Sequence, residues 1–172
     1  MLLVIGQFAL GIVYGQGLEW SLHKFLHTVG RKRSSRFAYH LHEHHRASRE
    51  NLFHDASYRG EGDGPYKEIR DVCLLVFLHL PVLFVLPAFF AGSCLQAMLY
   101  FFVHRQSHLD PEWCKRYVPW HYDHHMARNQ DANWGVTTCW IDHLVGTREV
   151  YLGTEREQKD TLRRLERRKL SS

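Results

Sequence analysis

A long uncharged run constrains this chain more than any other feature of its sequence. Residues 72–103, VCLLVFLHLPVLFVLPAFFAGSCLQAMLYFFV, contain no Asp, Glu, Lys or Arg. As one helix the run would be about 48 Å long, well beyond the roughly 30 Å hydrocarbon core of a bilayer. Pro81, Pro87 and Gly92 interrupt it. Taken alone, the run is compatible with one tilted span or with a hairpin of two short helices.

A second apolar run lies near the N-terminus. Residues 2–22, LLVIGQFALGIVYGQGLEWSL, are about long enough to cross a bilayer as a helix. No basic segment precedes the run and no obvious cleavage site follows it, which favours a retained membrane helix over a signal peptide. Gly11 and Gly15 form a small-xxx-small pair. The pair either seats a neighbouring helix or reflects the high frequency of glycine in membrane helices.

Composition excludes some classes of protein. The length of 172 residues suggests one domain. The net charge of +4 is modest, and without a base-stacking motif it gives no reason to expect a nucleic-acid partner. The cysteines are far apart and form no CxxC pair, so we expect free thiols in a reducing compartment. They are Cys73, Cys94, Cys114 and Cys139.

Most of the 14 histidines fall into four clusters that lie close to the ends of the apolar runs. The clusters are HKFLH (His23, His27), HLHEHH (His40, His42, His44, His45), HRQSH (His104, His108) and HYDHH (His121, His124, His125). Residues i and i+4 share one face of a helix, so two imidazoles at this spacing can bind one ion. Adjacent histidines point about 100° apart, so a doublet can send one ligand to each of two ions.

Ten such histidines would give two metal ions about four or five nitrogen ligands each. Imidazole suits zinc, copper, iron and nickel, whereas calcium and magnesium prefer oxygen ligands. An all-histidine pair of sites in a membrane protein favours iron that activates dioxygen. Either His40 or His42 completes the second cluster, and we favour His40 because it would share a helical face with His44. For the isolated His79 we expect a polar bridge between helices, while His54 and His143 fit either a supporting or a surface role.

Metal binding also predicts the topology. If all four clusters meet, residues 72–103 must enter the membrane and return, with the bend expected at Pro87–Ser93. This gives three apolar helices, at about 2–22, 72–88 and 90–103. The basic segment at 30–36 then indicates, by the positive-inside rule, that the clusters face the cytoplasm.

The expected fold class is therefore all-α. We expect a multi-pass integral membrane helical bundle with a cytoplasmic histidine-rich helical cap that holds a dinuclear metal site. The membrane domain would comprise residues 1–153. Residues 154–172 would form a charged C-terminal helix, either solvated or bound to anionic headgroups.

The order of the clusters resembles the fatty acid hydroxylase superfamily, which includes sterol desaturases, fatty acid hydroxylases and short carotene hydroxylases. Its pattern is HxxxH, then HxxHH or HxxxHH, then HxxxH, then HxxHH. The segment NWGVTTCWIDHLVGT, residues 133–147, is similar to the closing segment of that family. The resemblance covers about residues 19–150.

The resemblance implies a lipid-oxidising monooxygenase or desaturase with two iron ions, for which zinc can substitute in a purified protein. Dioxygen would be the co-substrate and a membrane lipid the substrate. The sequence holds no cytochrome b5-like domain and no flavin or nicotinamide fingerprint, so we expect a separate cytochrome b5-like or ferredoxin-like electron donor. The ligands carried over are His23, His27, His40, His44, His45, His104, His108, His121, His124 and His125.

Three carboxylates near the clusters could support the ligands, because metal-bound histidines usually donate their other N–H to an acceptor. Asp142 ranks first because it lies in the closing segment, followed by Glu19 and Asp123. Ordinary structural carboxylates would fit the same positions.

Three other hypotheses share parts of this pattern. A non-catalytic membrane metal-binding or transport protein would use the same histidines without consuming dioxygen. A zinc hydrolase is disfavoured because the chain has no HExxH motif and no nucleophile elbow. Within the enzyme hypothesis, a carotenoid is the alternative to a fatty acyl or sterol-like substrate.

Overall fold

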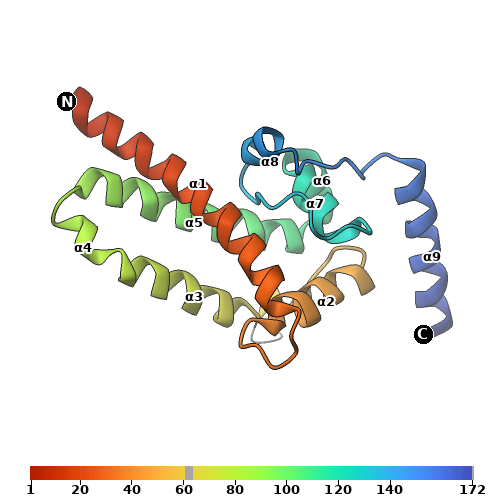
Figure 1. Ribbon diagram of the computed structural model, residues 1–172. Helices are drawn as coiled ribbons and strands as arrows, with labels where there is room; N and C mark the ends of the chain where they lie inside the picture. The colour runs from red at the N-terminus through yellow and green to blue at the C-terminus, as the bar shows by residue number, and fades with distance from the viewer. Residues whose placement is uncertain (61–63, 172) are drawn as a thin grey trace.

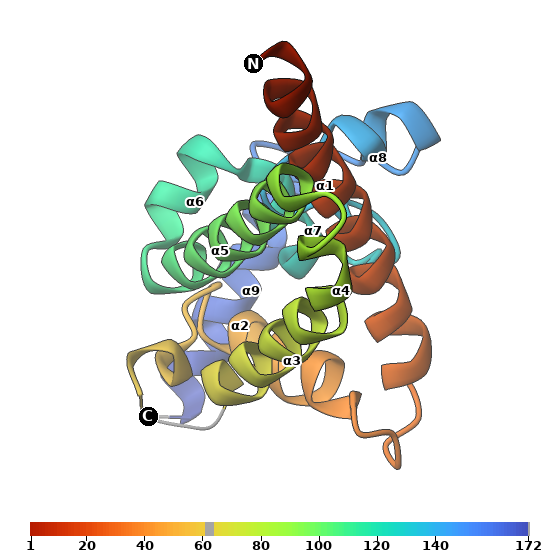
Figure 2. The same cartoon turned by 90° about the vertical axis from the view of Figure 1, so that its left-hand side faces the viewer.

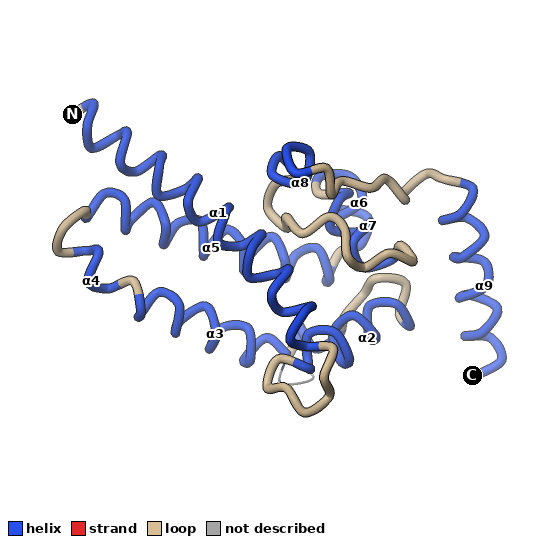
Figure 3. Tube along the Cα trace, in the orientation of Figure 1, coloured by secondary structure: helices blue, strands red, loops and turns tan. Residues whose placement is uncertain are grey.

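The computed structural model describes residues 1–60 and 64–171, and these residues form helices and loops without a strand (Figures 1 and 3). The expected all-α class is confirmed. The elements in chain order are α1 (Leu2–Gly30), the π-helix η1 (His40–His44), α2 (His45–Glu50), the 3₁₀-helix η2 (Ala56–Arg59), α3 (Gly64–Leu78), α4 (Leu80–Leu83), α5 (Pro87–Leu109), α6 (Pro111–Tyr117), α7 (Pro119–Met126), α8 (Trp140–Val145) and α9 (Glu155–Ser171).

One end of the molecule is built from long apolar helices. Among the described residues, α1 and α5 are long and apolar enough to cross a membrane. Their outer surfaces carry large exposed apolar side chains, including Leu3 and Met98, and the α3–α4 segment exposes Phe77 and Phe84 in the same way. Such an exposed apolar surface is unfavourable in water and marks a surface for lipid or another apolar partner.

The uncharged run does fold back on itself, but its bend lies earlier than expected. Helix α3 leads away from the cap, α4 makes the turn, and α5 runs back beside α1 (Figures 1 and 2). The bend therefore falls between Leu78 and Pro87, not at Pro87–Ser93. Pro87 starts α5, where its fixed φ suits a helix and its missing N–H costs no hydrogen bond. The apolar helices are accordingly 64–78 and 87–109 instead of 72–88 and 90–103.

Glycines allow α1 and α5 to cross with their backbones in contact. A Cβ placed on Gly11 would collide with the carbonyl oxygen of Phe89, and one on Gly92 would collide with that of Phe8. The hydroxyl of Ser93 donates to the carbonyl of Gly11 at 3.2 Å. The glycine pair on α1 therefore seats α5, as small residues do where membrane helices approach closely.

His79 bridges two helices of the apolar end, in line with the sequence expectation. Its Nδ1 lies 2.7 Å from the carbonyl oxygen of Leu75, which can only accept, so Nδ1 carries the proton. Nε2 is then the acceptor for the hydroxyl of Tyr14 at 2.8 Å. The pair ties the end of α3 to α1.

The other end of the molecule is a cap of short helices around the histidine clusters. Its apolar core includes Phe53, Cys114, Val118 and Met126, which pack against one another. The expected charged C-terminal helix is present as α9, on the far side of the cap from the apolar helices (Figure 1). Arg164 of α9 donates to the carbonyl of Met126 at 2.9 Å, which fixes α9 against α7.

Candidate metal centre

All ten candidate ligands are buried inside the cap, where His44 is the most exposed at 8%. They come from α1, from the junction of η1 and α2, from α5 and from α7. Buried imidazoles need partners, because an unpaired polar group away from water costs free energy. The arrangement of these ten side chains therefore decides what the cap can bind.

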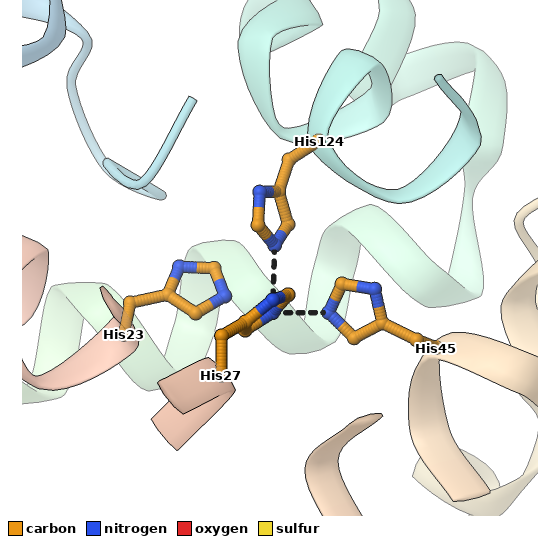
Figure 4. A group of neighbouring side chains, drawn as sticks. All are labelled: His23, His27, His45 and His124. Carbon is orange, nitrogen blue, oxygen red and sulfur yellow. Dashed lines mark hydrogen bonds between the residues drawn. The ribbon is translucent and has the colours of Figure 1, made fainter. Parts of the chain in front are cut away.

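The first group, called site 1, contains His23, His27, His45 and His124. Their candidate ligand atoms lie within 4.8 Å of one another. Nε2 of His27 is 3.1 Å from Nε2 of His45 and 3.2 Å from Nε2 of His124. Figure 4 draws these two contacts as dashed lines. The ring of His40 adjoins this group, with its centroid 4.9 Å from that of His45.

The second group, called site 2, contains His44, His104, His108 and His125. Their candidate ligand atoms also lie within 4.8 Å of one another. His121 adjoins this group, because its Nε2 is 3.2 Å from Nε2 of His108. Each group thus has four facing imidazoles and a fifth beside them.

The two doublets divide between the groups. His44 belongs to site 2 and His45 to site 1, whereas His124 belongs to site 1 and His125 to site 2. The rings of His45 and His125 stack with centroids 4.0 Å apart. This is the division expected from adjacent residues that point in different directions.

A π-turn sets the position of His40. The backbone N–H of His45 donates to the carbonyl of His40, five residues earlier, so these two residues lie one π-turn apart. His40 therefore shares a face with His45 and lies beside site 1. The α-helical spacing had predicted that His40 would share a face with His44. His42 points elsewhere: it is half-buried, and its ring bonds to the carbonyl of Arg31 at 3.2 Å.

The two groups fit metal ions. Within the described residues, Nε2 of His23, His44, His104 and His125 is buried without a hydrogen-bond partner. With metal–nitrogen bonds of about 2.1 Å, neighbouring ligand nitrogens would lie about 3.0–3.4 Å apart, close to the separations between facing imidazoles. Burial also lowers the pKa of His45, His124 and His125 well below 6.5, which keeps these rings neutral, the form that binds metal.

Backbone carbonyls hold the outer nitrogens of site 1. Nδ1 of His23 lies 2.7 Å from the carbonyl oxygen of Trp134, and Nδ1 of His124 lies 2.6 Å from that of Ala132. Asn133 between these carbonyls has a φ of +58°, in the left-handed region, which Asn tolerates better than most residues. Segment 132–134 thus fixes the orientation of two imidazoles.

Carboxylates hold two outer nitrogens of site 2. Nδ1 of His44 lies 2.9 Å from Oδ2 of Asp55, and Nδ1 of His104 lies 2.6 Å from Oε1 of Glu68. Nδ1 of His108 donates instead to the carbonyl of Phe53, a buried residue with a φ of +82°. No spacing pattern in the chain points to Asp55 or Glu68, because a loop and a separate helix bring them to the histidines.

The three carboxylates expected to support the ligands do not bond to a ligand imidazole, and they accept from backbone N–H groups and from other side chains instead. Asp142 accepts the amide N–H groups of Trp134 and Gly135, at 2.9 and 2.8 Å. It therefore orients the Trp134–Gly135 peptide, whose carbonyl bonds to His23, and does not itself bond to that ligand.

Glu19 and Asp123 also bind loops. Glu19 accepts the N–H groups of Val136 and Thr137. Asp123 accepts from Arg148 at 2.7 Å and from the N–H of Leu152. His143 is exposed on α8, and His54 is half-buried in the loop after α2.

Comparison with known families agrees with this geometry. The family model for fatty acid hydroxylase matches residues 8–147. The chain belongs to the fatty acid hydroxylase family. Membership implies an oxidoreductase that acts on lipids and has a histidine-rich metal site, and the matched range covers all four histidine clusters. No curated protein and no solved structure matches the chain significantly.

Proposed function

We propose that this member of the fatty acid hydroxylase family is a multi-pass membrane enzyme with a non-haem di-iron centre. It would use dioxygen to hydroxylate or desaturate a C–H bond of a fatty acyl or sterol-like lipid. Site 1 and site 2 would each hold one iron ion. The observation that carries the proposal is an apolar cavity that opens among the membrane helices and leads to the histidines.

The cavity has a volume of about 340 Å³ and lies between α1, α3 and α5. Side chains such as Leu18, Leu75 and Phe90 make its wall largely apolar, and His23 of site 1 is part of the same wall. A cavity of this kind suits the chain or ring of a lipid, which enters from the membrane without crossing water.

A smaller hollow of about 30 Å³ adjoins the histidines of both sites. It is lined by His40, His44 and His104, and it shares Glu68 and Tyr100 with the wall of the large cavity. A lipid in the large cavity would therefore have its nearest end beside both groups. This favours an enzyme over a storage or transport protein, because a metal store has no need of a lipid-sized cavity.

The chain supplies binding, orientation and exclusion of water. Helices α1, α5 and α7 and the η1–α2 junction carry the imidazoles. Hydrogen bonds to the outer nitrogens fix five of these rings, those of His23, His44, His104, His108 and His124. Iron bound to the imidazoles would supply the dioxygen chemistry, with hydroxylation following R–H + O₂ + 2e⁻ + 2H⁺ → R–OH + H₂O. Burial of the histidines keeps bulk water from the site, which limits side reactions.

The two electrons would come from a separate protein, cytochrome b5-like or ferredoxin-like. We place the cap in the cytoplasm, because the basic segment 30–36 lies at the cap end of α1. The donor would then reach the metal sites from the face of the cap that points away from the membrane.

Lipid analysis tests the proposal. Cells that make the protein and cells that make the His108→Ala variant should be compared by mass spectrometry. A lipid that gains one oxygen or loses two hydrogens, in cells with the unaltered protein alone, is the expected result. Identical lipids in both, with two metals bound per unaltered chain, would refute the enzymatic role.

A further inference from the structure

We infer that the two metal positions are unequal and that site 2 holds its metal more tightly than site 1. The inference rests on the proposed dinuclear centre and assigns the difference to Asp55 and Glu68. These carboxylates support two ligands of site 2, whereas the two supported ligands of site 1, His23 and His124, bond to neutral carbonyls.

Asp55 is well placed to act on His44. It is 4% exposed, and its Oδ2 accepts from Nδ1 of His44 at 2.9 Å. Its other oxygen accepts the N–H of Ser57 at 3.0 Å, which closes the turn into η2 and fixes the carboxylate. With Nδ1 held in this way, Nε2 of His44 faces the other site 2 histidines without a partner of its own.

Glu68 acts on His104 in the same manner. It is 7% exposed, and its Oε1 lies 2.6 Å from Nδ1 of His104. The buried hydroxyl of Tyr58 donates to Oε2 at 2.8 Å, so each carboxylate oxygen has a defined partner. Nε2 of His104 is again buried and without a partner among the described residues. Site 2 therefore contains two carboxylate–histidine pairs.

Site 1 has no such pair among its described contacts. The partners of His23 and His124 are the carbonyl oxygens of Trp134 and Ala132. A carbonyl accepts the same hydrogen bond as a carboxylate but carries no net charge. The geometry of the two sites is thus alike, while the charge behind their ligands differs.

Negative charge also lies near site 1, on Asp142 and Glu19. The oxygens of Asp142 are taken up by backbone and side-chain donors that include Trp20 and Thr147. Those of Glu19 accept from Val136, Thr137 and Gln96. Because these donors offset the charge and no ligand imidazole donates to it, we expect a weaker effect than that of Asp55 and Glu68.

A carboxylate partner makes an imidazole a stronger electron donor to a metal, and losing such a partner typically weakens metal binding by about 10–100-fold. The effect is larger in a buried site, where water does not screen the charge. Two carboxylates act on site 2. We therefore expect at least a tenfold difference in affinity between the two sites.

The test uses full-length protein in detergent, stripped of metal and loaded with Co²⁺ alone. Two variants isolate the sites: His27→Ala/His124→Ala leaves site 2, and His108→Ala/His121→Ala leaves site 1. Competition with a chelator measures each remaining affinity. We expect the site 2 protein to retain Co²⁺ at chelator concentrations at least tenfold higher than the site 1 protein.

Glu68→Gln, which keeps the shape but removes the charge, should weaken Co²⁺ binding about 10–100-fold in the site 2 protein and leave it unchanged in the site 1 protein. Asp55→Asn should act in the same direction. Glu43→Gln is the matched control, because Glu43 is exposed and pairs with Lys67 instead of a histidine.

Equal affinities in the two single-site proteins, or a loss from Glu68→Gln no larger than that from Glu43→Gln, would overturn the inference and leave the proposed function intact. Failure of the unaltered protein to bind Co²⁺ at all would overturn both. Absent lipid oxidation with two unequal sites would refute the enzymatic role alone.

Discussion

The second and fourth histidine clusters do the same work with different backbones. In α7 the spacing is His121, His124, His125, and an ordinary α-helix sends the outer two to site 2 and the middle one to site 1. At η1 the spacing is one residue longer, and a π-turn absorbs that residue. The outer histidines, His40 and His45, still face one site together.

The two halves of the chain also supply one ligand to each other's site. Helix α1 and the outer histidines of the second cluster build site 1, which borrows His124. Helix α5 and the outer histidines of the fourth cluster build site 2, which borrows His44. Each half therefore completes the site of the other, and the metals would link the two halves of the cap.

The largest expected effect comes from removing one ligand from each doublet. His44→Ala/His125→Ala removes two ligands from site 2 and should leave about one metal per chain, because site 1 stays whole. His44→Ala/His124→Ala removes one ligand from each site and should lower the metal content of both. Elemental analysis of the purified proteins measures the difference. Equal metal loss in the two variants would contradict the division of the doublets.

Acid should destabilise the metal-free cap. Burial lowers the pKa of His40, His45, His121 and His125 well below 6.5. Below pH 6.5 the unfolded chain takes up protons that the folded chain refuses, so the free energy of unfolding falls as the pH falls. Each histidine contributes at most about 1.4 kcal/mol per pH unit. Stability that is complete above about pH 7 should decline toward pH 5.

Thermal unfolding of the metal-free protein between pH 5 and 8 checks this expectation. His125→Gln should reduce the slope of the free energy of unfolding against pH, because the variant lacks one of the titrating rings. The reduction should correspond to about one proton. His143→Ala is the matched variant outside the two histidine groups, since His143 is exposed on α8. A free energy of unfolding that rises as the pH falls would contradict this expectation for the second and fourth clusters.

The crossing of α1 and α5 is expected to be sensitive to size. Gly92→Leu places a side chain against the backbone of α1 and should lower the free energy of unfolding by about 1–3 kcal/mol, the usual cost of overpacking. Chemical unfolding in detergent measures it. Gly6→Leu is the matched control, because a Cβ at Gly6 meets no atom within 4 Å. Equal effects would show that the close approach is not required.

The smallest effect is expected from shortening the second cluster to the spacing of the fourth. Deleting His42 gives HLEHH, which an ordinary α-turn can accommodate with the same three histidines facing the sites. The lost hydrogen bond to Arg31 should cost about 1 kcal/mol. Metal content should stay near two per chain. Loss of a metal would mean that the π-turn itself is needed to aim His40.

The sequence predicted the parts of this molecule that depend on local spacing. The four clusters, the division of the doublets and the return of the uncharged run follow from helix periodicity and from the need to bring His23 and His104 together. The bend lies earlier than the expected Pro87–Ser93 because Pro87, in the first turn of α5, starts a helix and does not break one.

The supporting shell could not be predicted in the same way. Asp55 and Glu68 reach their histidines through a loop with two consecutive residues at positive φ, Leu52 and Phe53, and through α3. Carboxylates closer to the clusters in sequence, such as Asp123, face other loops. Tertiary contacts bring Asp55 to His44 and Glu68 to His104, and no periodic pattern in the sequence predicts these pairs.

Because each site contains one histidine from the other half of the chain, the order of synthesis limits when the sites can be completed. His44 leaves the ribosome long before His104, and His23 long before His124, so neither site has its full set of ligands until α7 has been made. If the chain crosses the membrane as proposed, the first two clusters would wait at the membrane surface while α3 and α5 insert. In the proposed dinuclear centre, complete metal loading would follow the synthesis of α7, and a chain truncated before α7 would hold neither ion in its finished site.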